Sequence, residues 1–292
     1  MTSSTTHCNI RPFAGFTVYV LRTQMIEAAV VPELGAKIIS LKNLQTQREW
    51  LWHPKDKLEL FKNSSRDEFS AGPLVGIDEC LPTITPCSWR GRQLPDHGEV
   101  WSRPWTVDPR AWQRGFLKTS IKLEHSPFEF ERTLQLREDR LQFDYKLSNL
   151  AAMEEHFIWA IHPLLRLAKG DELELPESTR ALFNGEGWLD SVASAIPQKK
   201  CSKAFARPVR EGRAALRNNI HGDRLQFTWD PAANNTLGLW LSRGGWHGHH
   251  HFAIEPTNAD HDSLAVAAGL QRCGVVAGGG STRWTLSVCA GP

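Results

Sequence analysis

The stretch FLKTSIKLEHSPFEFERTLQLREDRLQFDYKL, residues 116–147, decides the fold class of this chain. Apolar and polar side chains alternate along three segments of it, at residues 117–123, 128–136 and 141–147. Such alternation is typical of strands that bury one face and expose the other. A Ser-Pro pair and a Glu-Asp-Arg turn separate the segments, so the stretch predicts a three-stranded antiparallel meander with one solvated face.

Shorter strand patterns continue on both sides of the meander. They cover residues 16–21, 25–31, 36–44, 156–161, 225–229, 237–241, 252–254 and 284–289. Residues 55–70 are charged and predict a surface loop with one short helical turn, whereas residues 72–105 are rich in Gly, Pro and Trp and lack a clear period. No segment has a helical period over three turns, and no repeat or linker divides the chain. We therefore predict an all-β protein, a single large antiparallel β-sandwich domain over residues 1–292.

The composition excludes several classes of protein. The chain has 292 residues, 41% of them hydrophobic, which is enough for a large core, and its formal net charge is +2. So balanced a charge gives no electrostatic basis for binding nucleic acid or an anionic membrane. The six cysteines form no C-x-x-C pair and indicate neither a zinc site nor a disulfide framework. The first ten residues lack an apolar signal segment and no run is long enough to cross a bilayer, so we expect a cytoplasmic protein.

The segment GWHGHHHFAIEP, residues 245–256, contains the first candidate for catalysis. On a strand, Glu255 shares a face with the histidines at alternate positions, while Phe252 and Ile254 point to the other face. Proline lacks the backbone donor, so we expect pairing to weaken at Pro256 and to leave Glu255 at a strand end. A carboxylate in that position is a candidate general base, and a salt bridge at the rim of the sheet is the structural alternative.

Two histidines are candidates for the second proton-transfer group. His97 lies between two acids in PDHGEVW, residues 95–101, and His162 comes directly before a proline at the end of a predicted strand. Histidine titrates near neutral pH and is the usual general acid or base. A hydrogen-bonded structural histidine is the alternative for each, and a solvated loop pair is the alternative for Asp96 and Glu99.

The histidines His247, His249 and His251 suggest a different chemistry, because imidazole is the commonest metal ligand. Alternate residues of a strand share a face and can converge on a metal. No cysteine accompanies them, however, and their spacing matches no fixed zinc motif. We therefore expect no metal site and keep a metal-dependent sugar isomerase or lyase as an alternative.

Three motifs taken together indicate a family. They are His97-Gly98 followed by Trp101 and Trp105, the segment WAIHP at residues 159–163, and Ile254-Glu255-Pro256. In their order and spacing the chain resembles the galactose mutarotase-like family of aldose 1-epimerases. Each motif is short, but the resemblance extends from residues 31–38 to residues 278–284 and so covers most of the chain.

The resemblance implies a β-supersandwich that binds a pyranose in an open cleft. In relatives a glutamate takes the proton of the anomeric hydroxyl, one histidine protonates the ring oxygen, and a second histidine binds and polarises the sugar. The matching residues here are Glu255, His162 and His97, in that order. The ring opens, the aldehyde rotates, and closure from the other face gives the other anomer, with no cofactor.

The expected substrate is a neutral aldose. Relatives commonly carry an arginine ahead of the His-Gly motif, but GIDECLP at residues 76–82 has acids there, which oppose an anionic sugar; Arg90, Arg92 and Arg103 are the candidates for a basic pocket. No residue matches the further acid that some relatives place between the His-Pro segment and the last glutamate. The side chains expected to bind the sugar are Asp78, Glu79, Asp96, Arg103 and Trp159. A sugar-binding protein without turnover is the main alternative, since fold does not determine function.

Overall fold

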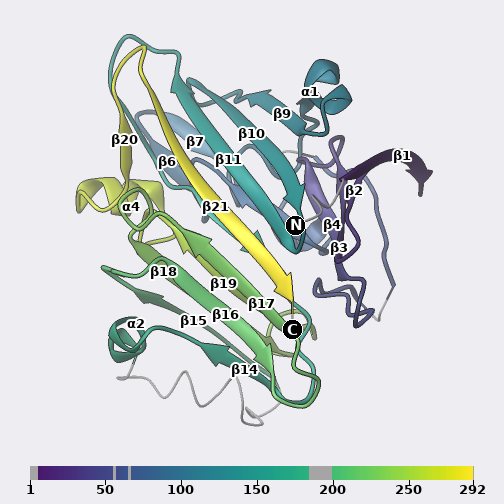
Figure 1. Ribbon diagram of the computed structural model, residues 1–292. Helices are drawn as coiled ribbons and strands as arrows, with labels where there is room; N and C mark the ends of the chain where they lie inside the picture. Colours follow the sequence, from purple (N-terminus) through teal and green to yellow (C-terminus); the bar gives the residue numbers. More distant parts are fainter. Residues whose placement is uncertain (1–5, 55–56, 65–66, 184–198, 292) are drawn as a thin grey trace.

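The computed structural model describes residues 6–54, 57–64, 67–183 and 199–291, and two large antiparallel sheets make up most of it (Figure 1). The first sheet has nine strands, in the spatial order β1 (His7–Phe13), β2 (Phe16–Arg22), β3 (Ile26–Val31), β4 (Lys37–Asn43), β5 (Ile77–Cys80), β13 (Ala160–Pro163), β19 (His250–Thr257), β18 (Thr236–Arg243) and β15 (Lys200–Ala206). The second has eight, in the order β14 (Asp171–Glu174), β16 (Arg213–Asn218), β17 (Arg224–Trp229), β21 (Ser281–Gly291), β11 (Arg140–Asn149), β10 (Phe128–Arg137), β9 (Leu117–Lys122) and β8 (Thr106–Val107).

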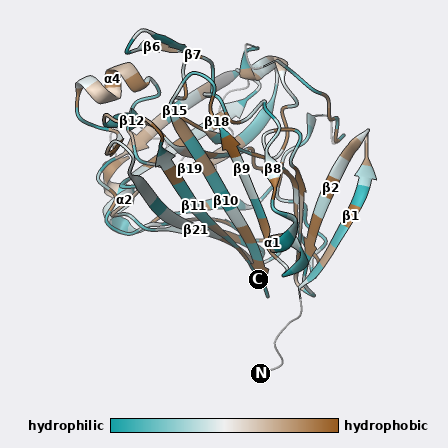
Figure 2. Cartoon of the chain, turned by 90° about the horizontal axis from the view of Figure 1, so that it is seen from above, coloured by the Kyte–Doolittle hydropathy of each residue, from teal (hydrophilic) through white to brown (hydrophobic). Residues whose placement is uncertain are grey.

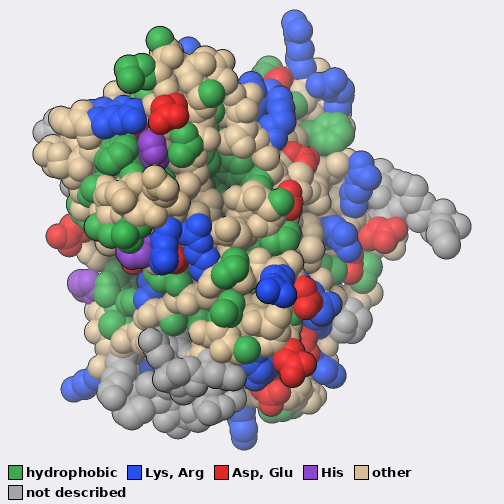
Figure 3. All heavy atoms as spheres, turned by 90° about the vertical axis from the view of Figure 1, so that its left-hand side faces the viewer, with side chains coloured by type: hydrophobic (Ala, Val, Ile, Leu, Met, Phe, Trp, Pro, Cys, Tyr) green, Lys and Arg blue, Asp and Glu red, His purple; other side chains and the backbone are tan. Residues whose placement is uncertain are grey.

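Two small strand pairs and a few short helices complete the structure. The pairs are β6 (Cys87–Trp89) with β7 (Arg92–Leu94), and β12 (Glu155–Phe157) with β20 (Gly274–Val276). The helical elements are η2 (Phe69–Ala71), α1 (Pro109–Gln113), α2 (Glu177–Leu182) and α4 (Leu264–Gly269). Within the described residues, none of the helices is long and apolar enough to cross a membrane. The face that carries α4 and β20 shows basic and acidic side chains scattered among apolar ones (Figure 3).

The predicted meander is present as β9, β10 and β11. Leu134 in β10 lies opposite Leu117 in β9 and Phe143 in β11, and all three are fully buried in the main hydrophobic cluster. Alternate positions face outward, where Glu131 forms an ion pair with Lys146 on the next strand at 2.7 Å. Figure 2 shows the alternation as apolar and polar bands along β10 and β11. The prediction of an all-β antiparallel sandwich is confirmed.

Some predicted strands have different limits. Residues 156–161, predicted as one strand, are divided between β12 and β13, which belong to different sheets. The reason is that the backbone N–H groups of Ile158 and Trp159 bond to Pro82 and to the Asn258 side chain instead of to a strand. In the described part of the chain, nine strands lie outside the predicted ranges, because they are short or lack alternation: β1, β5, β6, β7, β8, β14, β15, β16 and β20. The predicted loop at residues 55–70 leads into η2, and its residues 55–56 and 65–66 lie outside the described residues.

One fully buried ion pair joins the two sheets through the core. Nη1 of Arg132 in β10 donates to Oε1 of Glu79 in β5 at 2.9 Å, and neither side chain is exposed. Glu79 also accepts hydrogen bonds from the Tyr145 hydroxyl and the Trp159 indole N–H, each at 2.8 Å. Burial raises the pKa of Glu79 even though Arg132 and these donors oppose the shift. The network therefore ties β5 to β10 and β11 of the opposite sheet.

This network corrects the expectation for two residues. Glu79 and Trp159 were predicted to bind the sugar, but both are 0% exposed, and their polar atoms bond to each other. Side chains alternate along β5, so the acid at position 79 points into the core. Neither residue lines the pocket that contains His97, His162 and Glu255, so neither is retained as a sugar ligand.

Replacing Arg132 should strongly destabilise the protein. Arg132→Met leaves the Glu79 carboxylate buried without its cation, which typically costs about 3–5 kcal/mol of unfolding free energy. Arg137→Met makes the same change at an exposed position of the same strand and should have little effect. Urea unfolding followed by circular dichroism measures both. Equal losses for the two variants would show that the buried pair does not stabilise the fold.

Candidate active site

One pocket brings together side chains from β13, β15, β18 and β19 and from neighbouring loops. It is lined by Phe69, Ile84, Thr85, His97, His162, Leu164, Lys203, Trp240, Trp246, His251, Glu255 and Asp262. Its volume of about 150 Å³ leaves room for one small molecule. The residues predicted to transfer protons, His97, His162 and Glu255, all lie in its wall, although they come from distant parts of the chain. Two other cavities, around Glu174 and around Arg48, contain none of the three.

The register of the first sheet explains why these side chains share a face. Residues directly opposite each other on neighbouring strands point to the same side of a sheet. Glu255 in β19 lies opposite Gly238 in β18. Trp240 is two residues further along β18, so it points to the same side as Gly238, and it lies opposite Lys203 in β15. Ile254, one position out of phase with Glu255, points into the hydrophobic core, as predicted. The alternation of β19 therefore separates a core face from a pocket face.

The Glu255 side chain is fully buried in the wall of the pocket. Its Oε1 lies 3.8 Å from Nε2 of His162, and its Oε2 lies 3.2 Å from Nζ of Lys203. Neither oxygen has a hydrogen-bond partner within the described residues. Burial raises the pKa of Glu255, although the charge of Lys203 acts in the opposite direction. A raised pKa makes the carboxylate a stronger base near neutral pH.

Two expectations about Glu255 need correction. The strand β19 continues through Pro256, which lies opposite Leu237 in β18, so Glu255 is inside the strand and not at its end. A proline lacks only its own backbone N–H donor, and in a sheet each backbone N–H bonds to one neighbouring strand. The other residues of β19 therefore keep their hydrogen bonds, and the pairing with β18 continues past Pro256. The structural alternative, a salt bridge at the solvated rim of the sheet, does not hold either, because the Glu255 carboxylate that pairs with Lys203 is 0% exposed.

His162 lies in β13, opposite Asp78 in β5, and is nearly buried. Burial lowers the pKa of His162 well below its ordinary value, and the positive charge of Lys203 lowers it further. The imidazole is therefore mostly neutral at pH 7, and its imidazolium form is a stronger acid than an ordinary imidazolium. Its ring lies edge-on to the ring of His97, with the centroids 5.1 Å apart.

A tight turn directs His97 at the pocket. The backbone is left-handed at His97 (φ 57°) and at Gly98 (φ 76°), and a Cβ on Gly98 would lie 2.0 Å from the carbonyl oxygen of Leu81. Only glycine fits there. Nδ1 of His97 bonds to Oδ1 of Asp96 at 2.9 Å, and the ring stacks on Phe69 with the centroids 4.0 Å apart.

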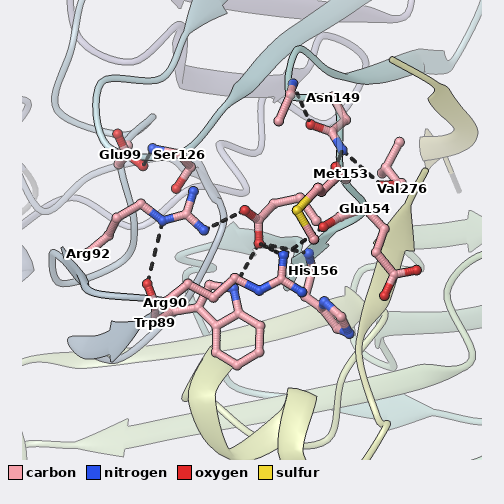
Figure 4. Close-up of polar contacts among 12 residues, drawn as sticks. Trp89, Arg90, Arg92, Glu99, Ser126, Asn149, Met153, Glu154, His156 and Val276 are labelled. Carbon is pink, nitrogen blue, oxygen red and sulfur yellow. Dashed lines mark hydrogen bonds and ion pairs between the residues drawn. The ribbon is translucent and has the colours of Figure 1, made fainter. Parts of the chain in front are cut away.

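Asp96 positions His97 and does not itself line the pocket. Its Oδ2 accepts the backbone N–H of Phe69 at 2.8 Å. Burial favours a higher pKa for Asp96, but the hydrogen bond and charge of His97 outweigh it, and the pKa is lowered. Glu99, the other acid of this turn, is buried and accepts three backbone N–H groups of residues 124–126, of which the contact with Ser126 is drawn in Figure 4. The two acids are therefore no solvated loop pair.

Asp78 and Arg103 also lie outside the pocket lining. Asp78 is fully buried and forms an ion pair with Lys37. Arg103 donates to the backbone oxygen of Lys122 at 3.1 Å and lies 3.3 Å from Glu124. Because neither side chain lines the pocket, neither is retained as a direct sugar ligand.

Two of the three arginines considered for a basic pocket, Arg90 and Arg92, instead form contacts that connect the β6–β7 pair to the segment around β12 (Figure 4). Arg92 and the indole N–H of Trp89 donate to the two carboxylate oxygens of Glu155, at 2.5 and 2.9 Å. Arg90 donates to the backbone oxygen of Glu154 at 2.7 Å. These contacts hold β6 and β7 against β12 and leave neither arginine in the pocket lining.

The histidine cluster packs on tryptophans. Nε2 of His251 lies 3.0 Å from Nε1 of Trp240, and because an indole N–H only donates, the proton of His251 is on Nδ1. Burial and the neighbouring histidines lower the pKa of His251 to about 3. The His249 ring packs on Trp52, with the centroids 5.0 Å apart. Across the described residues, no group of three or more His, Cys, Asp or Glu side chains is arranged to hold a metal ion.

Eight lining residues had not been predicted as site residues: Phe69, Ile84, Thr85, Leu164, Lys203, Trp240, Trp246 and Asp262. Trp240 lies within the predicted strand at residues 237–241, so its alternation offered a signal. Lys203 lies on β15, whose sequence KCSKAFA has no apolar period, and Asp262 lies in a loop. Only the pairing of β15 with β18 brings Lys203 to the pocket.

Comparison with known proteins agrees with the fold. The family model for aldose 1-epimerase matches residues 17–220. A galactose mutarotase-like protein from Clostridium acetobutylicum superposes with a TM-score of 0.74 at 12% identity, over 100% of this chain and 99% of that one. A protein from Synechocystis sp. PCC 6803 gives 0.69 at 16% identity, over 99% and 97% of the two chains. No curated protein matches the sequence.

The similar structures share the fold, and the family model covers more than half of the chain. The protein has the galactose mutarotase-like β-sandwich architecture. It belongs to the aldose 1-epimerase family.

Acid should destabilise the protein partly through His251. The pKa of this side chain is about 3 in the folded state, against 6.5 as its ordinary value, so below pH 6.5 the unfolded chain binds a proton that the folded protein does not. The contribution of His251 therefore lowers the unfolding free energy by about 1.4 kcal/mol per pH unit as the pH falls from 6.5 towards 3.

Urea unfolding between pH 6.5 and 5 tests this linkage. His251→Asn should flatten the pH dependence by about that slope, whereas His221→Asn, at an exposed histidine, should leave it unchanged. If His251→Asn kept the wild-type slope, His251 would have to become charged within the folded protein.

Proposed function

We propose that the protein is an aldose 1-epimerase that interconverts the α and β anomers of a neutral aldose. The observation that carries the proposal is the approach of Glu255 Oε1 to within 3.8 Å of His162 Nε2 in a pocket that also contains His97. The reaction needs one base and one acid on the same sugar, and this arrangement supplies both.

In the proposed reaction Glu255 removes the proton of the anomeric hydroxyl. The electron pair forms the carbonyl at C1, the bond from C1 to the ring oxygen breaks, and protonated His162 gives its proton to that oxygen. The open-chain aldehyde rotates about the bond between C1 and C2, and the reverse steps close the ring from the other face. Burial raises the pKa of Glu255, which strengthens it as a base. Burial lowers the pKa of His162, so only a small fraction of this side chain is protonated near neutral pH, and that fraction is a stronger acid than an ordinary imidazolium.

His97 binds and polarises the sugar in this scheme. Asp96 holds its ring by the 2.9 Å contact with Nδ1, which leaves Nε2 for a sugar oxygen. Phe69, Trp240 and Trp246 supply aromatic surfaces for the apolar faces of a pyranose. Preorganised polar groups of this kind cost no reorganisation during the reaction.

The charges of the pocket favour a neutral sugar. A phosphate needs unpaired cationic donors. Lys203 is engaged by two carboxylates, and Arg90, Arg92 and Arg103 bind protein groups outside the pocket lining.

A sugar-binding protein without turnover is the second candidate. The observation that favours it is the complete burial of Glu255 together with its ion pair to Lys203, because both restrict access of a sugar to the base. Binding of an aldose without accelerated anomer exchange would select this candidate.

Anomer exchange measured by NMR saturation transfer on a panel of aldoses tests the proposal. Wild-type protein should accelerate exchange, and Glu255→Gln and His162→Asn should each lose roughly 10²- to 10⁴-fold of the rate, because each removes one proton-transfer group. His125→Asn, at an exposed histidine outside the pocket lining, should retain full activity. Either pocket variant retaining most of the wild-type rate would refute the roles assigned here.

Sugar binding should also change the tryptophan fluorescence, because Trp246 lines the pocket. Trp246→Phe should lose much of the change on titration with an active aldose. Trp112→Phe, whose ring packs on Tyr19 away from the pocket, should keep it. A signal unaffected by both Trp246→Phe and Trp240→Phe would place the sugar elsewhere.

A further inference from the structure

A lysine lies between two carboxylates in the pocket, and the reaction above assigns it no role. Nζ of Lys203 lies 3.2 Å from Oε2 of Glu255 and 2.7 Å from Oδ1 of Asp262. The Lys203 side chain is only 19% exposed, and all three residues line the same pocket. An ammonium has three donors, and two of its neighbours here are anions.

The sheet leaves room for this contact across an intervening strand. Phe205 in β15, Gly238 in β18 and Glu255 in β19 lie in one cross-strand row. A Cβ on Gly238 would lie 3.3 Å from Cβ of Glu255 and 3.1 Å from the Phe205 ring. Because Gly238 has no side chain, the Glu255 carboxylate can extend across β18 to the ammonium group on β15.

Asp262 is held in place independently of its side chain. Its backbone oxygen accepts the N–H groups of Ile84 and Thr85, each at 2.9 Å, and the hydroxyl of Thr83 at 3.2 Å. The loop that carries Asp262 is thus fastened to the segment after β5. These backbone hydrogen bonds restrict the position of Asp262, whose carboxylate forms the ion pair with Lys203.

The other groups around Glu255 do not supply a permanent positive charge. His162 on β13 is mostly neutral near pH 7, because burial lowers its pKa well below the ordinary value. From β5, Asp78 is paired with Lys37, and burial raises the pKa of the Cys80 thiol, which stays neutral. His97, in the turn across the pocket, favours the Glu255 anion only in its protonated form.

Lys203 is therefore the permanent cation that faces Glu255. Asp262 repels the Glu255 charge and neutralises part of the ammonium. Among the described residues, no other lysine and no arginine forms an ion pair with Glu255.

We propose that Lys203 is a positioning residue, whose ammonium group, anchored by Asp262, keeps the buried Glu255 carboxylate ionised and directed at the reacting sugar. The inference rests on the proposed epimerase function. Without the cation, a fully buried carboxylate beside a second acid would take up a proton near neutral pH and could no longer act as a base. With the cation alone and no Asp262, the carboxylate would be ionised but a weaker base.

Two substitutions with opposite signs test this role. Lys203→Met keeps an unbranched side chain, one atom shorter than lysine, and removes its charge, so the pKa of Glu255 should rise by about 1–3 units. Asp262→Asn removes a repelling anion and should lower it. Lys203→Arg restores the charge and should return the pKa towards the wild-type value.

The first readout is independent of turnover. The ¹³C resonance of the Glu255 carboxyl, assigned as the signal absent from Glu255→Gln, is followed against pH in each variant. The second readout is the pH profile of kcat/KM for anomer exchange, whose acidic limb should move in the same direction as the carboxyl titration. At a pH below this limb, each unit of upward shift lowers kcat/KM about tenfold, and higher pH restores it.

The outcomes separate this inference from the proposed function. Opposite shifts of the carboxyl titration in Lys203→Met and Asp262→Asn support the role of Lys203, even if the wild-type protein exchanges no anomers; the epimerase function alone would then fail. Unchanged titrations of the Glu255 carboxyl in both variants would overturn the proposed role of Lys203. A raised KM with an unchanged pH profile in Lys203→Met also overturns it, because Lys203 would then contact the substrate. If Lys203→Met does not fold by circular dichroism, the direction of the shift in Asp262→Asn decides.

Discussion

The buried ion pair between Glu79 and Arg132 is the constraint on which the rest of the structure depends. It crosses the core from β5 of one sheet to β10 of the other, and Tyr145 and Trp159 complete the bonding of the carboxylate. Burying two charges is costly unless their hydrogen bonds are satisfied, so such a pair tolerates only a narrow range of positions. The position of β5 relative to the second sheet is thereby restricted.

Strand pairing makes the positions of the pocket residues depend on the position of β5. β13 pairs with β5, which sets His162 opposite Asp78, and β19 follows β13 in the sheet and carries Glu255. The turn that holds His97 is also fastened to this region, because Glu99 N–H bonds to the Leu81 oxygen directly after β5 at 2.7 Å. Rigid strands and a tight glycine turn thus hold the site, which favours the small tolerances that proton transfer needs.

The electrostatic environment of the pocket shifts the pKa values of Glu255 and His162 away from their ordinary values. Glu255 and His162 lie in the same low-dielectric pocket, where burial disfavours the charged form of each and moves their pKa values in opposite directions. The side chains of Lys203 and Asp262 are more exposed than that of Glu255, and their charges act on the Glu255 carboxylate in opposite directions. In the proposed reaction, the balance between burial and this lysine sets the strength of the base.

The sequence by itself determined the fold class and the three residues that meet in the pocket. Alternation along residues 116–147 reports burial of one face, and the short His-Gly, His-Pro and Glu-Pro motifs carry the resemblance to the family. Both signals are local, since they depend on neighbours in the chain. Only the tertiary structure decided which polar residues surround the site, because this depends on strand order and register between distant segments. It placed Glu79 and Trp159 in the core and brought Lys203 of β15, which no pattern marked, to 3.2 Å from Glu255.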